Sequence, residues 1–147
     1  MTQKNIIFED TILLNEIDKE GRFFEKVSRV DAISEVYDCK LSFDVNVDAY
    51  PIQKGAYYSF VLAKSLNTDG MASPNTFSYD LYTKKNTLLE KYDYVMYGKI
   101  FKYNEENDGK ISLYISFGGL LLSITGSANH LNELKIDERI YMLMKKI

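Results

Sequence analysis

The feature that most constrains the fold is a strict alternation of apolar and polar residues between Cys39 and Asp48. The odd positions from Cys39 to Val47 are apolar, and the even positions from Lys40 to Asp48 are polar. Because successive side chains of a strand point to opposite faces, this pattern predicts a β-strand with one buried and one solvated face. Residues 111–117 repeat the pattern, and four of their side chains are expected to point inward: Ile111, Leu113, Ile115 and Phe117.

Runs rich in Tyr, Phe, Ile and Val predict six further strands. These runs cover residues 6–17, 23–34, 57–66, 92–103, 120–126 and 138–146. One short helix is expected over Ser127–Leu134, where the Ser127 side chain can cap the first turn. About eight short strands with one small helix predict an all-β fold, an antiparallel barrel or sandwich, and closing the sheet would remove exposed strand edges.

The connections between the expected strands differ in character. Gly118-Gly119 stands where a two-residue primed turn would place it, although a bulge or a close approach of another backbone is an alternative. Residues 67–87 collect small and polar residues without periodicity, so they are expected to form a long mobile loop or a loop ordered by a partner. The chain of 147 residues is expected to form one domain over 1–147.

Charge and composition restrict the class of partner. The formal net charge is -3, and only three of the 18 basic residues are Arg, so the chain lacks the positive field that holds nucleic acid. The longest apolar run, residues 117–122, is too short to cross a bilayer, and residues 1–10 lack the apolar core of a signal peptide. We expect a protein that works in solution inside the cell, without a membrane partner.

No catalytic or metal-binding constellation is evident. Cys39 and His130 are the only Cys and the only His, and Cys39 opens the buried face of a strand, so a core thiol is expected there. Asp44, Asn46 and Asp48 imitate the start of a calcium loop, but the following positions do not fit, and a solvated strand face is expected instead. No cofactor is expected.

An excess of apolar residues remains in two segments. In residues 92–101 the even positions Tyr92, Tyr94, Met96 and Ile100 are apolar or aromatic, and so are the odd positions Val95, Tyr97 and Phe101. Residues 117–122 show the same two-sided character. A strand with one solvated face should alternate, so the outer face is covered either by the chain itself or by a second protein. The sequence leaves both possibilities open.

The same two segments carry a family resemblance. The stretches Tyr92–Gly98 and Ser116–Leu121 resemble the two signature stretches of the small subunit, commonly numbered eighth, that nuclear RNA polymerases I, II and III share. Weaker similarities follow in the right order along the chain, at Lys26-Val27-x-Arg29, Cys39-Lys40-Leu41, Asp44-Val45-Asn46-Val47, Pro51, Ser65-Leu66-Asn67 and Leu131-Asn132-x-Leu134. Two features depart from the family: residues 67–87 do not match and lack its Trp, and the chain ends in Lys145-Lys146-Ile147, where Arg is more usual.

The resemblance implies a barrel of the oligonucleotide-binding type with a mobile loop between two strands. It also implies a non-catalytic subunit in the nucleus, packed mainly against the largest polymerase subunit, with the catalytic magnesium held by the large subunits. Any direct contact with nucleic acid is expected to be weak.

The residues expected at the interface with the polymerase are Tyr92, Tyr94, Met96, Gly118, Gly119 and Leu121. The aromatic rings and Met96 would supply anchor area, and the glycines would permit close backbone approach.

Two alternatives belong to other classes. A single-stranded nucleic-acid-binding barrel would use the 12 Tyr and 8 Phe residues as stacking platforms, but the net charge of -3 opposes it. A barrel that encloses a small ligand is disfavoured by the many large inward side chains.

Overall fold

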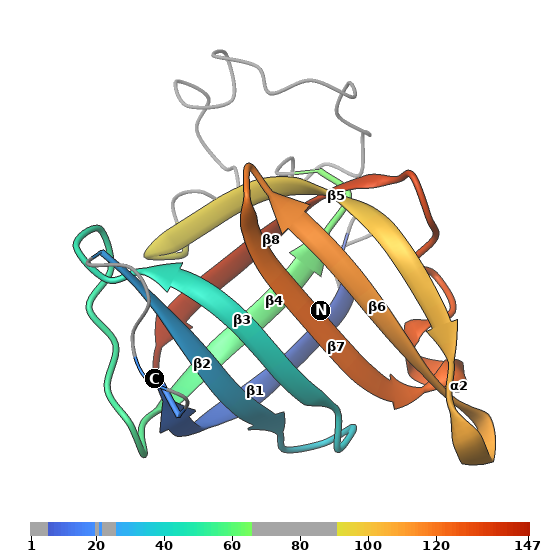
Figure 1. Cartoon of the computed structure of the whole chain (residues 1–147), viewed down its shortest axis with the longest axis horizontal. Coiled ribbons are helices and arrows are strands. Elements are labelled where there is room, and N and C mark those ends of the chain that lie inside the picture. Colours follow the sequence, from blue (N-terminus) through green and yellow to red (C-terminus); the bar gives the residue numbers. More distant parts are fainter. Residues whose placement is uncertain (1–5, 20, 22–25, 66–90) are drawn as a thin grey trace.

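The computed structural model describes residues 6–19, 21, 26–65 and 91–147, and within them eight strands close into an antiparallel barrel (Figure 1). The strands are β1 (Ile6–Ile17), β2 (Val27–Ser34), β3 (Lys40–Asn46), β4 (Tyr57–Ala63), β5 (Tyr94–Glu105), β6 (Lys110–Phe117), β7 (Leu120–Ser127) and β8 (Arg139–Lys146). Their order around the barrel is β1-β2-β3-β7-β6-β5-β8-β4. The predicted all-β fold and its barrel form are confirmed, and each of the eight expected strands is present, with several ends shifted by a few residues and residues 23–25 and 66 outside the described part. The expected loop at 67–87 lies outside the described residues.

The main hydrophobic core fills the inside of the barrel. The alternation in β3 places Leu41, Phe43 and Val45 on the inner face, as predicted, and all three are buried. The Phe43 ring meets the Phe60 ring of β4 at a centroid distance of 6.0 Å, so large side chains from opposite walls meet in the interior. Cys39 is fully buried in this core, which confirms the expected core thiol.

A second, smaller cluster lies on the outer face of the barrel over β4, β8 and β5. Its centre is fully buried and consists of Val61, Ala63, Tyr141 and Leu143. Val95 and Tyr97 of β5 pack against this cluster, while Tyr94 and Met96 pack against the main core. Both faces of β5 are therefore half-buried at its start, each against one of the two clusters, which accounts for the failure of its sequence to alternate.

Tyr92 is the exception to the predicted facing in this segment. It was grouped with Tyr94 and Met96, but its ring packs with the outer cluster. The reason is that β5 begins at Tyr94, so the period of two does not extend back to Tyr92. A register shift between Ile100 and Lys102 interrupts the same strand further on, and Phe101 there is 47% exposed.

The short helix α2 spans Ala128–Leu131, which is shorter than the expected Ser127–Leu134. Ser127 caps it as predicted, since its hydroxyl oxygen accepts a hydrogen bond from the Asn129 backbone N–H at 3.2 Å. In the described part of the chain, no helix has the length and apolar character needed to span a bilayer.

Gly98 allows β5 and β6 to approach closely. A Cβ atom at this position would lie 2.3 Å from the Ser116 carbonyl oxygen and 2.6 Å from Cδ1 of Phe117. We therefore expect Gly98→Ala to lower the free energy of unfolding by about 1–3 kcal/mol through overpacking. Urea denaturation of the variant measures this loss, and Ser123→Ala on the outer face of β7 is the control. An unchanged midpoint for Gly98→Ala would contradict the close packing described here.

Candidate functional site

The turn between β6 and β7 is the most exposed of the predicted site segments. Gly118 and Gly119 have φ angles of 64° and 102°, so the two-residue primed turn is confirmed. A Cβ atom built on either glycine would have no atom within 4 Å apart from those of the residues next to it in the chain. In the isolated chain these two positions therefore require glycine because of their backbone conformation and not because of crowding. The space around them is open to the backbone of another protein.

Leu121 follows this turn and presents an exposed apolar side chain at the start of β7. It is 42% exposed, and its partner across the hairpin is Ser116. The Leu121 backbone N–H donates to the Asp44 carboxylate at a distance of 2.9 Å between nitrogen and Oδ2. The other carboxylate oxygen, Oδ1, accepts from Nε of Arg29. The turn is thus connected to β2 and β3 through one acidic side chain.

The expectation of a solvated face at Asp44, Asn46 and Asp48 is wrong for Asp44, which is only 8% exposed. Its burial follows from the two contacts with Arg29 and Leu121. The Asn46 side-chain oxygen accepts from the backbone N–H groups of Asp48 and Ala49 and so shapes the turn after β3. Among the described residues no group of three or more His, Cys, Asp or Glu side chains could hold a metal ion.

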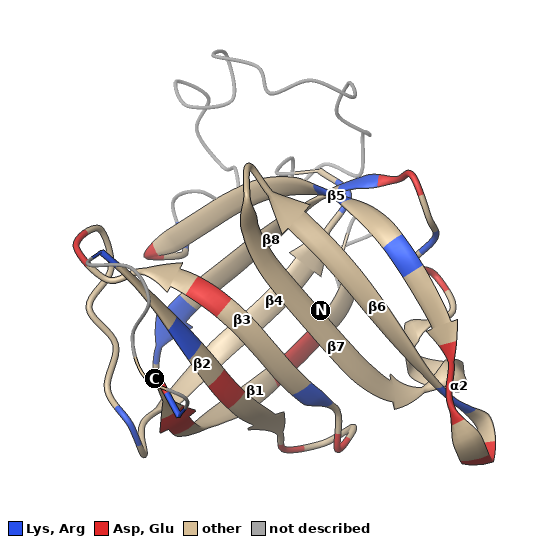
Figure 2. Cartoon of the chain, viewed as in Figure 1, with Lys and Arg blue, Asp and Glu red and all other residues tan. Residues whose placement is uncertain are grey.

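A groove runs beside the β6–β7 turn over the outer face of β2 and β3. Its volume is about 650 Å³, and it is lined by Asp18, Lys19, Gly21, Val27, Arg29, Asp31, Ser42, Asp44, Gly118, Gly119 and Leu120. Figure 2 shows charged residues along β2 and β3, whereas the β6–β7 hairpin next to them carries no charged residue after Lys110 at the start of β6. Of these groove residues only Gly118 and Gly119 were predicted from the sequence, although Arg29 and Asp44 stand in stretches that carry the weaker family similarity.

Tyr94 and Met96 lie at the end of the barrel near this turn. Pairing of β5 with β6 starts at Lys99 and Ser116, so the first residues of β5 extend past the end of β6 and pair with β8. The Tyr94 hydroxyl oxygen accepts from the Asn46 backbone N–H at 3.2 Å and donates to the Met96 sulfur at 3.3 Å. The Tyr94 ring stacks on Tyr50 with a centroid distance of 5.1 Å and an interplanar angle of 8°. Both side chains thus close the barrel end.

The six predicted interface residues therefore fall into three environments. Gly118, Gly119 and Leu121 form an exposed turn, and Tyr94 and Met96 are half-buried against the main core. Tyr92 packs with the outer cluster, and Nζ of Lys145 lies 5.1 Å from the centroid of its ring. The turn and the groove beside it, called the turn–groove site below, are the part of the prediction that offers an open surface.

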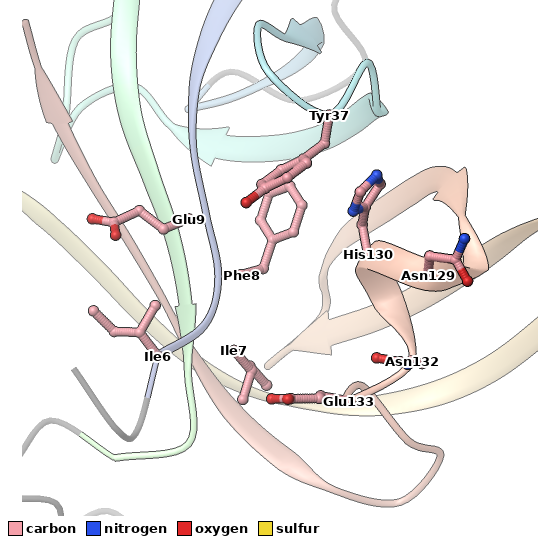
Figure 3. A pocket seen from close by; sticks show the side chains of 9 residues that line it. All are labelled: Ile6, Ile7, Phe8, Glu9, Tyr37, Asn129, His130, Asn132 and Glu133. Atoms are coloured by element: carbon pink, nitrogen blue, oxygen red, sulfur yellow. The ribbon is translucent and has the colours of Figure 1, made fainter. Parts of the chain in front are cut away.

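A second cavity lies at the opposite end of β3, where His130 is found (Figure 3). Its volume is about 310 Å³. The rings of His130 and Tyr37 lie against each other in this cavity, with a distance of 4.4 Å between their centroids. The Cys39 thiol lies in the core, where it donates to the Tyr37 carbonyl oxygen at 3.9 Å, and burial raises its pKa. Because a raised pKa keeps the thiol protonated, Cys39 is not poised as a nucleophile.

Comparison with known proteins identifies relatives along nearly the whole chain. Residues 9–146 match the family model described as RNA polymerase Rpb8. A protein of Dictyostelium discoideum named DNA-directed RNA polymerases I, II, and III subunit rpabc3 is 48% identical, over 97% of this chain and 98% of its own length. The Arabidopsis thaliana DNA-directed RNA polymerases II, IV and V subunit 8B is 38% identical over 100% of both chains. The Saccharomyces cerevisiae subunit RPABC3 is 34% identical, over 97% of this chain and 99% of its own.

The two glycines of the turn should differ in their tolerance of substitution. Gly119, at φ 102°, lies outside the region that other residues adopt, so Gly119→Ala is expected to lower the free energy of unfolding by about 1–2 kcal/mol. Gly118, at φ 64°, lies in the left-handed region that Asn tolerates, so Gly118→Asn should lower the free energy of unfolding by less than Gly119→Ala does. Urea denaturation of both variants tests this order, and equal losses would contradict the assigned turn geometry.

Tyr50 should make the barrel sensitive to alkali. Burial, followed by the charge of Asp93, raises the pKa of the Tyr50 hydroxyl from 10.0 to about 12. Because the pKa is higher in the folded state than in the unfolded state, the hydroxyl ionises first in the unfolded chain. Its ionisation therefore leaves the free energy of unfolding unchanged well below pH 10 and lowers it as the pH rises from 10 toward 12. Tyr50→Phe is therefore expected to make the urea midpoint fall less between about pH 9 and pH 11. If the urea midpoint of Tyr50→Phe fell with pH as steeply as that of the wild type, the raised pKa of Tyr50 would be contradicted.

Proposed function

The chain belongs to the RNA polymerase Rpb8 family, and from this membership we propose that it is a non-catalytic structural subunit shared by the nuclear RNA polymerases I, II and III. The observation that carries the proposal is the match along nearly the full length of subunits whose names place them in these polymerases. Because the alignment with this chain covers almost the full length of these relatives, the proposed function applies to the whole barrel and not to one part of it.

The proposed mechanism is scaffolding in the nucleus. The closed barrel presents the turn–groove site, and its partner is the largest polymerase subunit, as the family resemblance implies. Leu121 supplies an exposed apolar side chain, and the two glycines leave room for a partner backbone. Tyr94 and Met96 contribute by closing the barrel end beneath this site.

The alternative of a stand-alone nucleic-acid binder is disfavoured by the charges at the site. Three carboxylates, those of Asp18, Asp31 and Asp44, line the groove together with only two cations, Lys19 and Arg29, and Arg29 is engaged by Asp44. Phosphate groups would meet this negative charge without a matching excess of cations. The turn–groove site therefore suits a protein surface better than a phosphate backbone.

The decisive experiment is purification of the tagged chain from nuclear extract with a high-salt wash, followed by mass spectrometry of the co-eluting proteins. Stoichiometric recovery of the largest subunits of all three polymerases is the expected result. Recovery of the barrel alone, or with salt-labile nucleic acid, would contradict the proposed function.

The contribution of Leu121 can be tested in the same assay. Leu121→Glu places a charge on the exposed apolar position and is expected to reduce recovery of the polymerase at least tenfold, which corresponds to about 1.4 kcal/mol of binding free energy. Ile136→Glu is the matched control, since Ile136 is 47% exposed and lies outside the turn–groove site. Equal recovery for both variants would remove Leu121 from the interface.

A further inference from the structure

The ladder between β3 and β7 ends at the point where the exposed turn begins. Its pairs run from Lys40 with Thr125 to Phe43 with Leu122, and the next residues in the same register are Asp44 and Leu121. At this position the Leu121 N–H donates to the Asp44 carboxylate, at 2.9 Å, instead of to a backbone carbonyl of β3. Asp44 therefore holds the hairpin against β3 one residue beyond the end of the ladder.

Arg29 holds the other oxygen of the same carboxylate. Arg29 and Asp44 are direct neighbours across β2 and β3, and their side chains form an ion pair through Nε and Oδ1. The Arg29 backbone N–H donates to Oδ1 of Asp18 at 3.0 Å, and the Ser28 hydroxyl donates to Oδ2 at 2.7 Å. A continuous polar network thus crosses the groove floor from the β1–β2 turn to the β6–β7 turn.

We infer that Asp44 is a positioning residue of the docking site, which fixes the β6–β7 turn and Leu121 relative to the groove. This inference rests on the proposed function, since it concerns how the turn–groove site is kept ready for its partner. On the other side of the hairpin, the recorded pairing of β6 with β5 extends only to Ser116. The Asp44 side chain is 11% exposed, and its carboxylate accepts two directional hydrogen bonds, so its geometry is well defined.

The consequence for docking is preorganisation. A partner that contacts both the Leu121 side chain and the groove requires the two surfaces in one fixed arrangement, and ordering the hairpin during binding would weaken the affinity. Loss of Asp44 should therefore act through the orientation of the turn, while the inner face of the barrel, where the main core lies, remains in place.

The test compares Asp44→Asn with Asp31→Asn. Both substitutions remove one negative charge from the same groove, but the structure records no contact of the Asp31 carboxylate with the hairpin. Asp44→Asn is expected to reduce recovery of polymerase at least tenfold and to speed hydrogen exchange of the Leu121 amide at least tenfold. Asp31→Asn should change each by less than threefold, and amides of β1 and β4 should keep their protection in both variants.

A second variant covers the possibility that Asp44→Asn does not fold. The Arg29 side chain is 53% exposed, so Arg29→Gln breaks the same ion pair from the solvent side. It should also speed exchange at Leu121 and lower polymerase recovery.

Unchanged recovery for both Asp44→Asn and Arg29→Gln would overturn the inference, and so would exchange that accelerates equally over the whole barrel. Failure of the wild-type chain to recover polymerase would instead contradict the proposed function, so the two failures are distinguishable.

Discussion

Closure of the sheet is the constraint on which the other features of this structure depend. β4 pairs with both β1 and β8, so the first and last strands of the described chain become joined through a third. A closed barrel leaves no row of unpaired backbone groups for another chain to join, which matters for strands this rich in Tyr and Ile. Closure also separates an inner surface, which must be packed, from an outer surface that is free to serve other purposes.

Backbone pairing closes the barrel, but two of its ladders end before the tip of the β6–β7 hairpin. The β6–β7 hairpin leaves β3 after Phe43 and leaves β5 at Lys99, so its tip stands apart from both neighbours. The Asp44 carboxylate spans the gap between β3 and the hairpin by accepting the Leu121 N–H. The Tyr94 hydroxyl accepts the Asn46 N–H and so links β5 directly to the end of β3. The exposed β6–β7 turn and the polar contacts beside it therefore have one common origin, which is the early end of two ladders.

The sequence predicts the barrel well because its strongest signals are local. The alternation in residues 39–48 and 111–117 identifies the inner side chains, and Gly118-Gly119 identifies the hairpin turn. The position of Asp44 could not be predicted in this way, because its burial depends on Arg29 and on Leu121, 77 residues away. The facing of Tyr92 was missed for a related reason, since the sequence does not show that β5 begins two residues later.

The order of the strands has a consequence for the synthesis of this protein. β8 follows the other seven strands in the chain, yet it lies between β4 and β5 in the barrel. Until β8 emerges from the ribosome, the two strands that flank it lack one neighbour each, and Tyr141 and Leu143 are missing from the outer cluster. A nascent chain therefore presents open, aromatic strand edges until β8 is available to pair, a stage at which aggregation competes with folding.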